Sequence, residues 1–461
     1  MRNKSILKAF GIMLLVTFIL TWVVPSSMIE SGGVKVGSIA PTGFADIFTS
    51  LEIVATYFLK PALLILFVGM FYGVANESGA LKAVVNKFVS WFKDKKNLFV
   101  VLTVLFYSVI TALTGIYLPL FMFVPLSIAI LFGLKYNKVQ SILATVGAST
   151  IGLIAQVFNP FLLQVTNVTK DSFIWIKVGL LVVLVLLTIF YIIKVSVKKD
   201  KAESSDDKLM FVPQTRDLKT KSNVKGLALS IILLLLFVIF ILGLTPWKDP
   251  LATEFTKAYD AINGVKIANF AIFKSILGTF EVFGKWTINS VIVTIAFATI
   301  VLSISNRVSF KEMIEESYNG IKKVAGLALL AALISLIVIF TLNSGFIGTI
   351  VKFIAKGGNI ALVTIASFVG TPFMVDFNYA VQYVLSVLFY TVNNESLLGL
   401  YGFVVQLTYG FAMLVLPSSI LLMVGLGYVE ESYSKWLKYI WKFLLAVFVA
   451  ILIAISIATL L

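Results

Sequence analysis

Residues that could bind a small charged molecule occur at four places in an otherwise apolar chain. Two of these places are hydrophobic segments interrupted by proline, at Asn159-Pro160 and at Pro417-Ser418-Ser419. Proline lacks a backbone N–H and clashes with the preceding helical turn, so main-chain carbonyls lose their helical partners there. Inside a membrane such carbonyls must line a protein cavity or bind an ion. Proline kinks without a ligand are common in membrane helices, but two kinks at matching positions favour a binding site.

The other two places are the tips of two short apolar hairpins, at residues 111–119 and 370–379. Gly and Pro at both tips allow a tight reversal, and N–H groups at the start of each second arm could bind a carboxylate. Asp376 lies between aromatic residues of the second tip, where a charge is costly and usually faces a cavity. A buried Asp376 could hold Na⁺, accept a proton or pair with an amino group of the substrate. The alternative is that it caps the second arm near water.

These four places give two overlapping sets of predicted ligands. The substrate-binding set comprises Thr114, Gly115, Asn159, Gly370, Thr371, Asp376, Asn378, Ser418 and Ser419. The ion-binding set comprises Ser149, Thr150, Asn159, Thr408 and Ser418. Na⁺ is the only metal ion expected, as a coupling ion, and no cofactor and no catalytic residue are predicted.

Composition restricts the class of protein that carries these residues. The 461-residue chain is 59% hydrophobic and 13% charged, which excludes a water-soluble globule. Cysteine and histidine are both absent, so thiol chemistry and a histidine proton shuttle are excluded. A membrane-embedded enzyme would need clustered acidic residues or histidines, and a channel would need a carbonyl filter or an acidic ring. The apolar segments show neither pattern, so both classes are disfavoured.

The hydrophobic runs predict an all-α polytopic membrane protein of the cell membrane, embedded in the lipid bilayer. Several runs reach the roughly 20 residues that a helix needs to cross a bilayer, whereas the hairpin arms are shorter and are predicted to be re-entrant. The nine predicted spans are 9–25, 51–75, 139–165, 172–195, 224–245, 287–305, 325–342, 397–428 and 437–461. The two hairpins are 97–134 and 359–391.

Charge gives these spans a direction. The net charge is +15, and most of the 37 basic residues fall in the loops that this topology places in the cytoplasm. That bias follows the positive-inside rule and predicts a cytoplasmic N-terminus and an extracellular C-terminus. Basic loops therefore explain the charge, and no nucleic-acid partner is expected. Residues 246–286 form an external stretch that is either an interfacial helix or a further re-entrant piece.

Two stretches of the chain read as distant copies. Asn76-Glu77-Ser78-Gly79 precedes an amphipathic run, and Asn343-Ser344-Gly345 precedes a similar one. A hairpin and a proline-interrupted span follow each copy, and the single span 224–245 between the units makes them antiparallel. The domains are a first inverted repeat 1–195 with broken span 139–165, a connecting region 196–286 with the charged linker 198–223, and a second inverted repeat 287–461 with broken span 397–428.

Four sequence blocks resemble the YfcC-type carriers of the ion transporter superfamily. They are Thr21–Pro25, Gly73–Leu81, Asn159–Phe161, and the long block from Leu416-Pro417-Ser418-Ser419 to Lys438. The resemblance implies inverted repeats, re-entrant hairpins, elevator-type alternating access and homodimers. It also implies carboxylate substrates, C4-dicarboxylates or amino acids, with arginine/ornithine exchange among them.

The sequence departs from these carriers at both tips. Such carriers often have paired acidic residues at the first tip, where this chain has Gly115-Ile116-Tyr117-Leu118, and small residues at the second, where Pro372-Phe373-Met374 and Asp376 stand. We therefore expect a secondary transporter for a small carboxylate-bearing metabolite, an amino acid or a C4-dicarboxylate, that works by ion coupling or exchange. The alternative is a basic amino acid (arginine/ornithine) antiporter, and a channel or a membrane-embedded enzyme ranks below both.

Overall fold

The computed structural model describes residues 4–30, 32–166, 172–195, 210–211, 222–267, 270–278 and 280–460. Within these residues, nine helices are long and apolar enough to cross a membrane, and the strands form only two short hairpins. The predicted class, an all-α polytopic membrane protein with about nine spans, is confirmed. Most of the predicted charged linker, 198–223, lies outside the described residues.

The first part of the chain runs from α1 to α11 and is almost entirely helical. The elements are α1 (Lys4–Val23), β1 (Ser27–Glu30), β2 (Gly33–Val36), α2 (Asp46–Thr49), α3 (Leu51–Ile53), η1 (Val54–Phe58), α4 (Leu59–Glu77), α5 (Ala80–Phe92), η2 (Lys93–Lys95), α6 (Lys96–Thr114), η3 (Pro119–Phe123), α7 (Val124–Gly133), α8 (Lys138–Ile142), η4 (Leu143–Gly147), α9 (Ala148–Ile154), α10 (Pro160–Val165) and α11 (Ile174–Lys194). The connecting region contributes α12 (Ser222–Leu244), α13 (Leu251–Gly264), β3 (Lys266–Ile267), β4 (Phe270–Ala271) and α14 (Ile272–Leu277).

The last part of the chain repeats the order of the first. Its elements are α15 (Ile288–Ser305), α16 (Phe310–Ser344), α17 (Phe346–Ala355), α18 (Ile360–Gly370), η5 (Thr371–Phe373), α19 (Phe377–Tyr379), η6 (Ala380–Leu385), α20 (Ser386–Val392), η7 (Glu395–Leu397), α21 (Leu398–Val415), α22 (Ile420–Tyr428) and α23 (Tyr433–Ala458). In both halves a long helix, an amphipathic helix, a hairpin, an interrupted helix and a closing helix follow one another. The hairpins are α6–α7 and α18–α20, and the interrupted helices are α8–α10 and α21–α22.

All but one of the predicted spans coincide with a long helix. The exception is 139–165, because its helical part ends at Ile154 and is shorter than the other spans. Its place among the nine long helices is taken by Ala80–Thr114, in which α5 runs on through η2 into α6. The ring centroids of Phe88 and Phe99 lie only 6.4 Å apart, so the chain bends sharply at η2. The first arm of the hairpin is α6 alone, which begins at Lys96, next to the predicted start of the hairpin.

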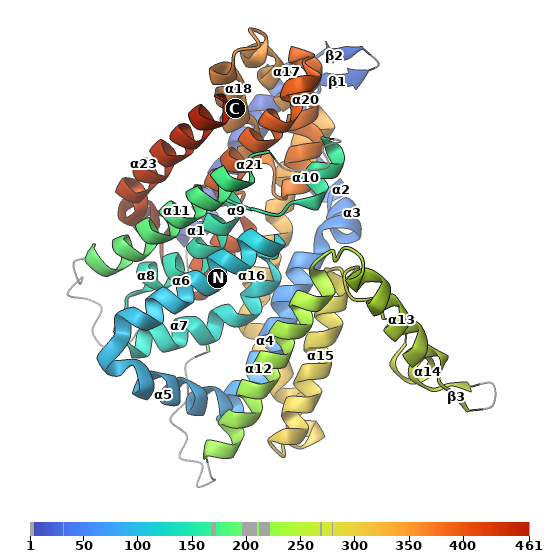
Figure 1. Cartoon of the computed structure of the whole chain (residues 1–461), viewed down its shortest axis with the longest axis vertical. Coiled ribbons are helices and arrows are strands. Elements are labelled where there is room, and N and C mark those ends of the chain that lie inside the picture. Colours follow the sequence, from blue (N-terminus) through green and yellow to red (C-terminus); the bar gives the residue numbers. More distant parts are fainter. Residues whose placement is uncertain are drawn as a thin grey trace.

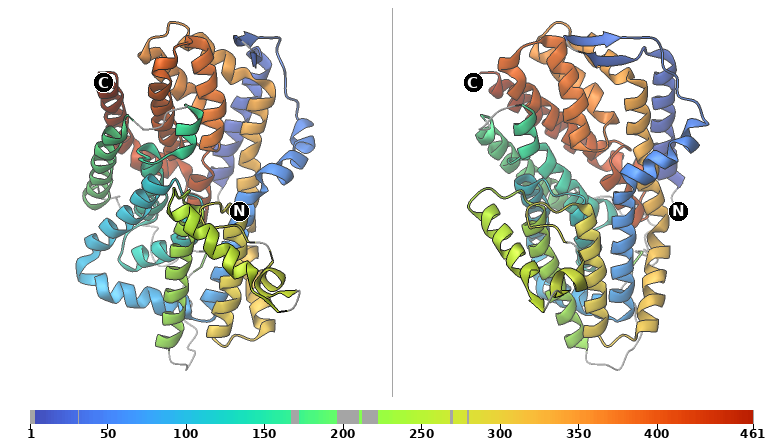
Figure 2. Two further views of the ribbon diagram at one scale, coloured as in Figure 1. Left: turned by 45° about the vertical axis from the view of Figure 1, so that its right-hand side comes forward. Right: turned by 90° about the vertical axis from the view of Figure 1, so that its right-hand side faces the viewer.

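The long helices of the two halves run antiparallel and pack closely. A Cβ atom on Gly73 would lie 2.2 Å from the carbonyl oxygen of Glu316, and one on Gly320 would lie 2.1 Å from that of Gly69. Only glycine permits this approach of two backbones. Gly69 also meets Val324, so sequence numbers rise along α4 as they fall along α16. Figure 2 shows α4, in blue, beside the gold α16 in both views.

The core lies where the interrupted helices meet. In the most apolar 18-residue segment of Glu395–Tyr428, which contains α21 and α22, 83% of the residues are buried. The corresponding figure for α23 is 33%, so α21 and α22 are central and α23 is peripheral. α9 packs against α6 and α21, and α21 packs against α18. Helices α17, α18 and α20 gather at one end of the molecule beside the β1–β2 hairpin, while α5 lies towards the other end (Figure 1).

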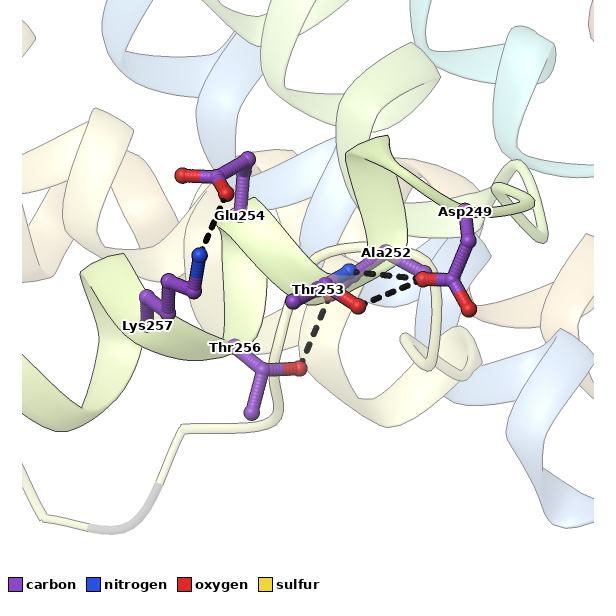
Figure 3. A network of polar contacts seen from close by, with 6 residues as sticks. All are labelled: Asp249, Ala252, Thr253, Glu254, Thr256 and Lys257. Carbon is purple, nitrogen blue, oxygen red and sulfur yellow. Dashed lines mark hydrogen bonds and ion pairs between the residues drawn. The ribbon is translucent and has the colours of Figure 1, made fainter.

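The described part of the stretch 246–286 forms an arm that projects from the bundle (Figure 1). It contains the helix α13, which has no buried residue. Asp249 stabilises the start of this helix, because one carboxylate oxygen accepts hydrogen bonds from Thr253 N (3.2 Å) and Thr253 Oγ1 (2.6 Å). Lys257 pairs with Glu254 at 2.7 Å one turn further on (Figure 3).

Candidate functional site

A cavity of about 590 Å³ lies where both hairpin tips, both interrupted helices and the start of α4 converge. This volume falls in the range of small-molecule sites. The first tip contributes residues 114–119, and the second contributes Val375, Asp376 and Asn378. Thr150 and Ser419 come from the interrupted helices, and Lys60 from α4. Elements that are far apart in the sequence therefore build one chamber.

A hydrogen bond joins the two tips. The hydroxyl of Tyr117 donates to Asp376 Oδ2 at 3.3 Å, and the backbone N–H of Asn378 donates to Asp376 Oδ1 at 2.8 Å. Asp376 thus caps the second arm, where α19 begins, and lines the cavity at the same time. The two roles that the sequence presented as alternatives coexist in one carboxylate.

The first tip is held by hydroxyl groups and a glycine. Gly115 ends α6 with a φ of +72°, in the left-handed region that glycine adopts at low cost. Thr111 Oγ1 donates to the carbonyl of Ile116 at 3.0 Å, and the N–H of Ile116 donates to Thr114 Oγ1 at 3.1 Å. These bonds fix the reversal locally, so the tip presents a neutral polar surface to the cavity.

The first interruption lies between α9 and α10. Asn159 caps the restarted helix, because its side chain accepts a hydrogen bond from Leu162 N at 3.0 Å. The amide of Gln406 on α21 donates to the carbonyls of Gln156 (2.8 Å) and Ile154 (3.3 Å). The sequence predicted free carbonyls near Gln156, and the second half of the chain supplies their partner.

The second interruption lies between α21 and α22 and is built in a similar way. Ser419 caps α22, because its side chain accepts a hydrogen bond from Leu422 N at 3.3 Å. The hydroxyl of Tyr433 donates to Val415 O at 2.7 Å, and the indole of Trp436 donates to Leu414 O at 3.3 Å. Both donors come from α23, the next helix in the same half.

The structure divides the predicted ligands into two groups. Thr114, Gly115, Thr150, Asp376, Asn378 and Ser419 line the cavity. Ser149, Asn159, Gly370, Thr371, Thr408 and Ser418 are buried outside its wall. Thr408 pairs with Ser367 through their hydroxyls at 2.7 Å, and Thr371 donates to Ser367 O at 2.9 Å. The Ser418 hydroxyl is fully buried and makes no hydrogen bond within the described part of the chain.

Sequence reasoning missed Lys60, the cationic residue of the cavity wall. Lys60 precedes Pro61 in the apolar run 51–75, and both residues line the cavity. A signal for it existed, since an ionisable residue inside a predicted span is by default a functional candidate. The ring of Phe58 stacks on that of Tyr379 with centroids 5.7 Å apart, so the start of α4 adjoins the second tip.

Two π-helical segments contribute to the wall of this cavity, and a third precedes a helix that does. Tyr57 and Phe58 of η1 line it, as does Gln382 of η6, and η4 leads directly into α9, which contributes Thr150. Such wide turns occur in short pieces, frequently at functional sites. Across the described residues, no group of three or more His, Cys, Asp or Glu side chains is placed to hold a metal ion.

Comparison with known proteins identifies the family to which this chain belongs. The family model described as the C4-dicarboxylate anaerobic carrier, DcuC, matches residues 59–382, which include Lys60, the first tip and Asp376. No curated protein matches the sequence significantly. The crystal structure of the YdaH transporter of Alcanivorax borkumensis superposes with a TM-score of 0.40 and 15% identity, over 99% of this chain and 98% of that one. The chain belongs to the DcuC family of C4-dicarboxylate anaerobic carriers, which are transporters and not enzymes.

Proposed function

We propose that this protein is a secondary active transporter that moves a C4-dicarboxylate or a related carboxylate-bearing amino acid across the cell membrane, by ion coupling or by exchange. The observation that carries the proposal is the hydrogen bond between Tyr117 and Asp376. It joins the hairpin tips of both halves at a single cavity of small-molecule size. Twin halves that share one central site are the usual design of secondary transporters.

The way in which the cavity wall is divided between two sets of helices supports a mechanism of alternating access. Lys60 belongs to α4, which packs on the long helix α16, whereas Asp376 and Ser419 belong to the hairpins and interrupted helices. We propose that the hairpins and interrupted helices move as one body past α4 and α16 and carry the substrate with them. The resemblance of the sequence to YfcC-type carriers supports this elevator movement. It also supports a homodimer in which the long helices form the fixed scaffold.

A basic amino acid antiporter is the second candidate. Asp376 favours it, because a carboxylate in the cavity would attract a guanidinium or ammonium group. Lys60 opposes it, because a second cation beside a dibasic amino acid would be repelled. The balance of these two side chains favours a substrate that carries at least one carboxylate without a second basic group.

Transport by purified protein in proteoliposomes tests the proposal. Radiolabelled succinate, fumarate, aspartate and arginine would each be offered, with or without counter-substrate inside and with Na⁺ or pH gradients. We expect saturable uptake of a carboxylate that internal substrate stimulates. Arginine exchange alone would support the second candidate, and a current that saturates weakly and ignores internal substrate would mean a channel.

The buried hydroxyl of Ser418 provides a test of ion coupling. We propose that Na⁺ binds beside the second interruption, where this oxygen lacks a partner. Ser418→Ala should raise the Na⁺ concentration needed for half-maximal uptake about ten-fold, because a neutral ligand oxygen is lost. Ser456→Ala is the matched control, since that hydroxyl lies on the exposed face of α23. Unchanged Na⁺ dependence in Ser418→Ala would exclude this hydroxyl as a ligand.

A further inference from the structure

Two opposite charges face one cavity without neutralising each other. Among the described residues that line the cavity, only Lys60 and Asp376 carry a formal charge. No ion pair within 4.0 Å joins them. A charge inside a membrane protein is costly unless it is paired or solvated, so the half-buried Asp376 favours a cationic ligand. The exposed Lys60 can attract an anion to the same cavity.

The surroundings of Asp376 leave its charge uncompensated. Its two oxygens accept hydrogen bonds from the Tyr117 hydroxyl and from the N–H of Asn378, and both donors are neutral. These bonds orient the carboxylate towards the cavity that it lines. The missing partner is therefore a cation that arrives with the substrate or beside it.

The surroundings of Lys60 are equally suited to an incoming anion. Lys60 is exposed and borders the cavity, next to the stacked pair Phe58 and Tyr379, so its amine is open to an incoming anion. The cavity wall also contains neutral hydroxyl and amide groups, among them those of Thr114, Thr150, Asn378, Gln382 and Ser419. A first carboxylate can pair with Lys60 while a second accepts hydrogen bonds from these neutral groups.

We propose that Lys60 and Asp376 together select an amino-dicarboxylate: Lys60 binds a carboxylate, and Asp376 binds the α-ammonium group. This inference rests on the proposed function and names its substrate class. The charges of the pair cancel, so a plain dicarboxylate would bring two negative charges towards a carboxylate with one lysine to offset them. An ammonium group on the same molecule relieves that repulsion and satisfies Asp376 at once.

The first test is a competition assay with the wild-type protein in proteoliposomes. Uptake of labelled L-aspartate would be inhibited by unlabelled L-aspartate, succinate, N-acetyl-L-aspartate and L-arginine. We expect L-aspartate to compete at least about ten-fold better than succinate or the N-acetyl compound, because both lack the ammonium group. If succinate is exchanged and L-aspartate is not, the inference fails while the proposed function stands. If no carboxylate is exchanged at all, the proposed function itself fails.

Variants then assign the two charges. Asp376→Asn should weaken aspartate uptake about 100-fold and leave succinate uptake unchanged or improved, because only the ammonium group loses its partner. Lys60→Gln should weaken both substrates, and Lys60→Arg should restore a measurable part of each. The matched controls Asp94→Asn and Lys93→Gln make the same chemical changes in the exposed segment η2 and should transport normally.

One outcome would show that Asp376 binds the coupling ion and not the ammonium group of the substrate. In that case Asp376→Asn would abolish uphill uptake of succinate and aspartate alike, while exchange down a gradient would survive for both. Should the Asn variant fail to fold, Asp376→Glu keeps the charge, and the wild-type competition series still decides the substrate class. Equal losses of both substrates in Asp376→Asn would overturn the inference.

Discussion

The two interrupted helices solve the same problem with partners from different places. Carbonyls released between α9 and α10 accept hydrogen bonds from Gln406, which belongs to the other half of the chain. Carbonyls released at the end of α21 accept hydrogen bonds from Tyr433 and Trp436, which follow in the same half. The first interruption is therefore bound to the opposite half of the chain, whereas the second is completed by its own half.

This difference shows what the shared architecture determines and what it leaves open. Both halves keep a capped restart, with Asn159 and Ser419 in the same role. The chemistry at the tips is not shared, because Asp376 in the second half is charged and the first tip is neutral. The common framework brings the two hairpin tips and the two interrupted helices together at one cavity. The local residues then decide what binds in that cavity.

Gln406→Leu should have the largest effect on stability, since it removes both hydrogen bonds from its side chain to the first interruption. Two buried carbonyls would lose their donor, at a cost of about 3 kcal/mol. Thermal unfolding in detergent should show a clear fall in Tm, and transport should fall with it. Gln164→Leu, at an exposed position of α10, is the control and should change stability by about 0.5 kcal/mol or less.

Tyr433→Phe should have a smaller effect, because it removes one hydrogen bond and leaves Trp436 in place. We expect a loss of about 1 kcal/mol in unfolding measurements and transport within about two-fold of wild type. Tyr318→Phe, which alters an exposed tyrosine, should change neither quantity. If Tyr433→Phe impairs transport as strongly as Gln406→Leu, the two interruptions do not differ in the way that we describe.

Sequence patterns were sufficient to predict most of the fold. Hydropathy placed all but one of the long helices, and proline near a capping residue marked both interruptions, because these features act locally. Hydropathy failed at 139–165, where the break at Asn159 shortens the helix below span length, and at Ala80–Thr114, where an amphipathic helix continues into a hairpin arm. Continuation through a charged turn such as η2 depends on packing that composition does not reveal.

The site was predictable in part for a related reason. Asp376 and Ser419 stood out because charge or proline marked their neighbourhoods, and both line the cavity. Lys60 was hidden by the excess of lysines in the chain, most of which are explained by loops. The partnership of Gln406 with Gln156 joins residues 250 positions apart, so only the tertiary structure could reveal it.

Tyr117→Phe is the mildest change and examines the direct contact between the tips. Its bond to Asp376 is long, at 3.3 Å, so its loss should cost about 0.5–1 kcal/mol and raise the KM for substrate about three-fold. Tyr136→Phe removes a hydroxyl that donates to Asn97 Oδ1 at 2.8 Å at the base of the same hairpin, and it should leave KM unchanged. A change in KM without a change in Tm would show that Tyr117 orients the carboxylate of Asp376. A fall in Tm with an unchanged KM would instead make the contact structural.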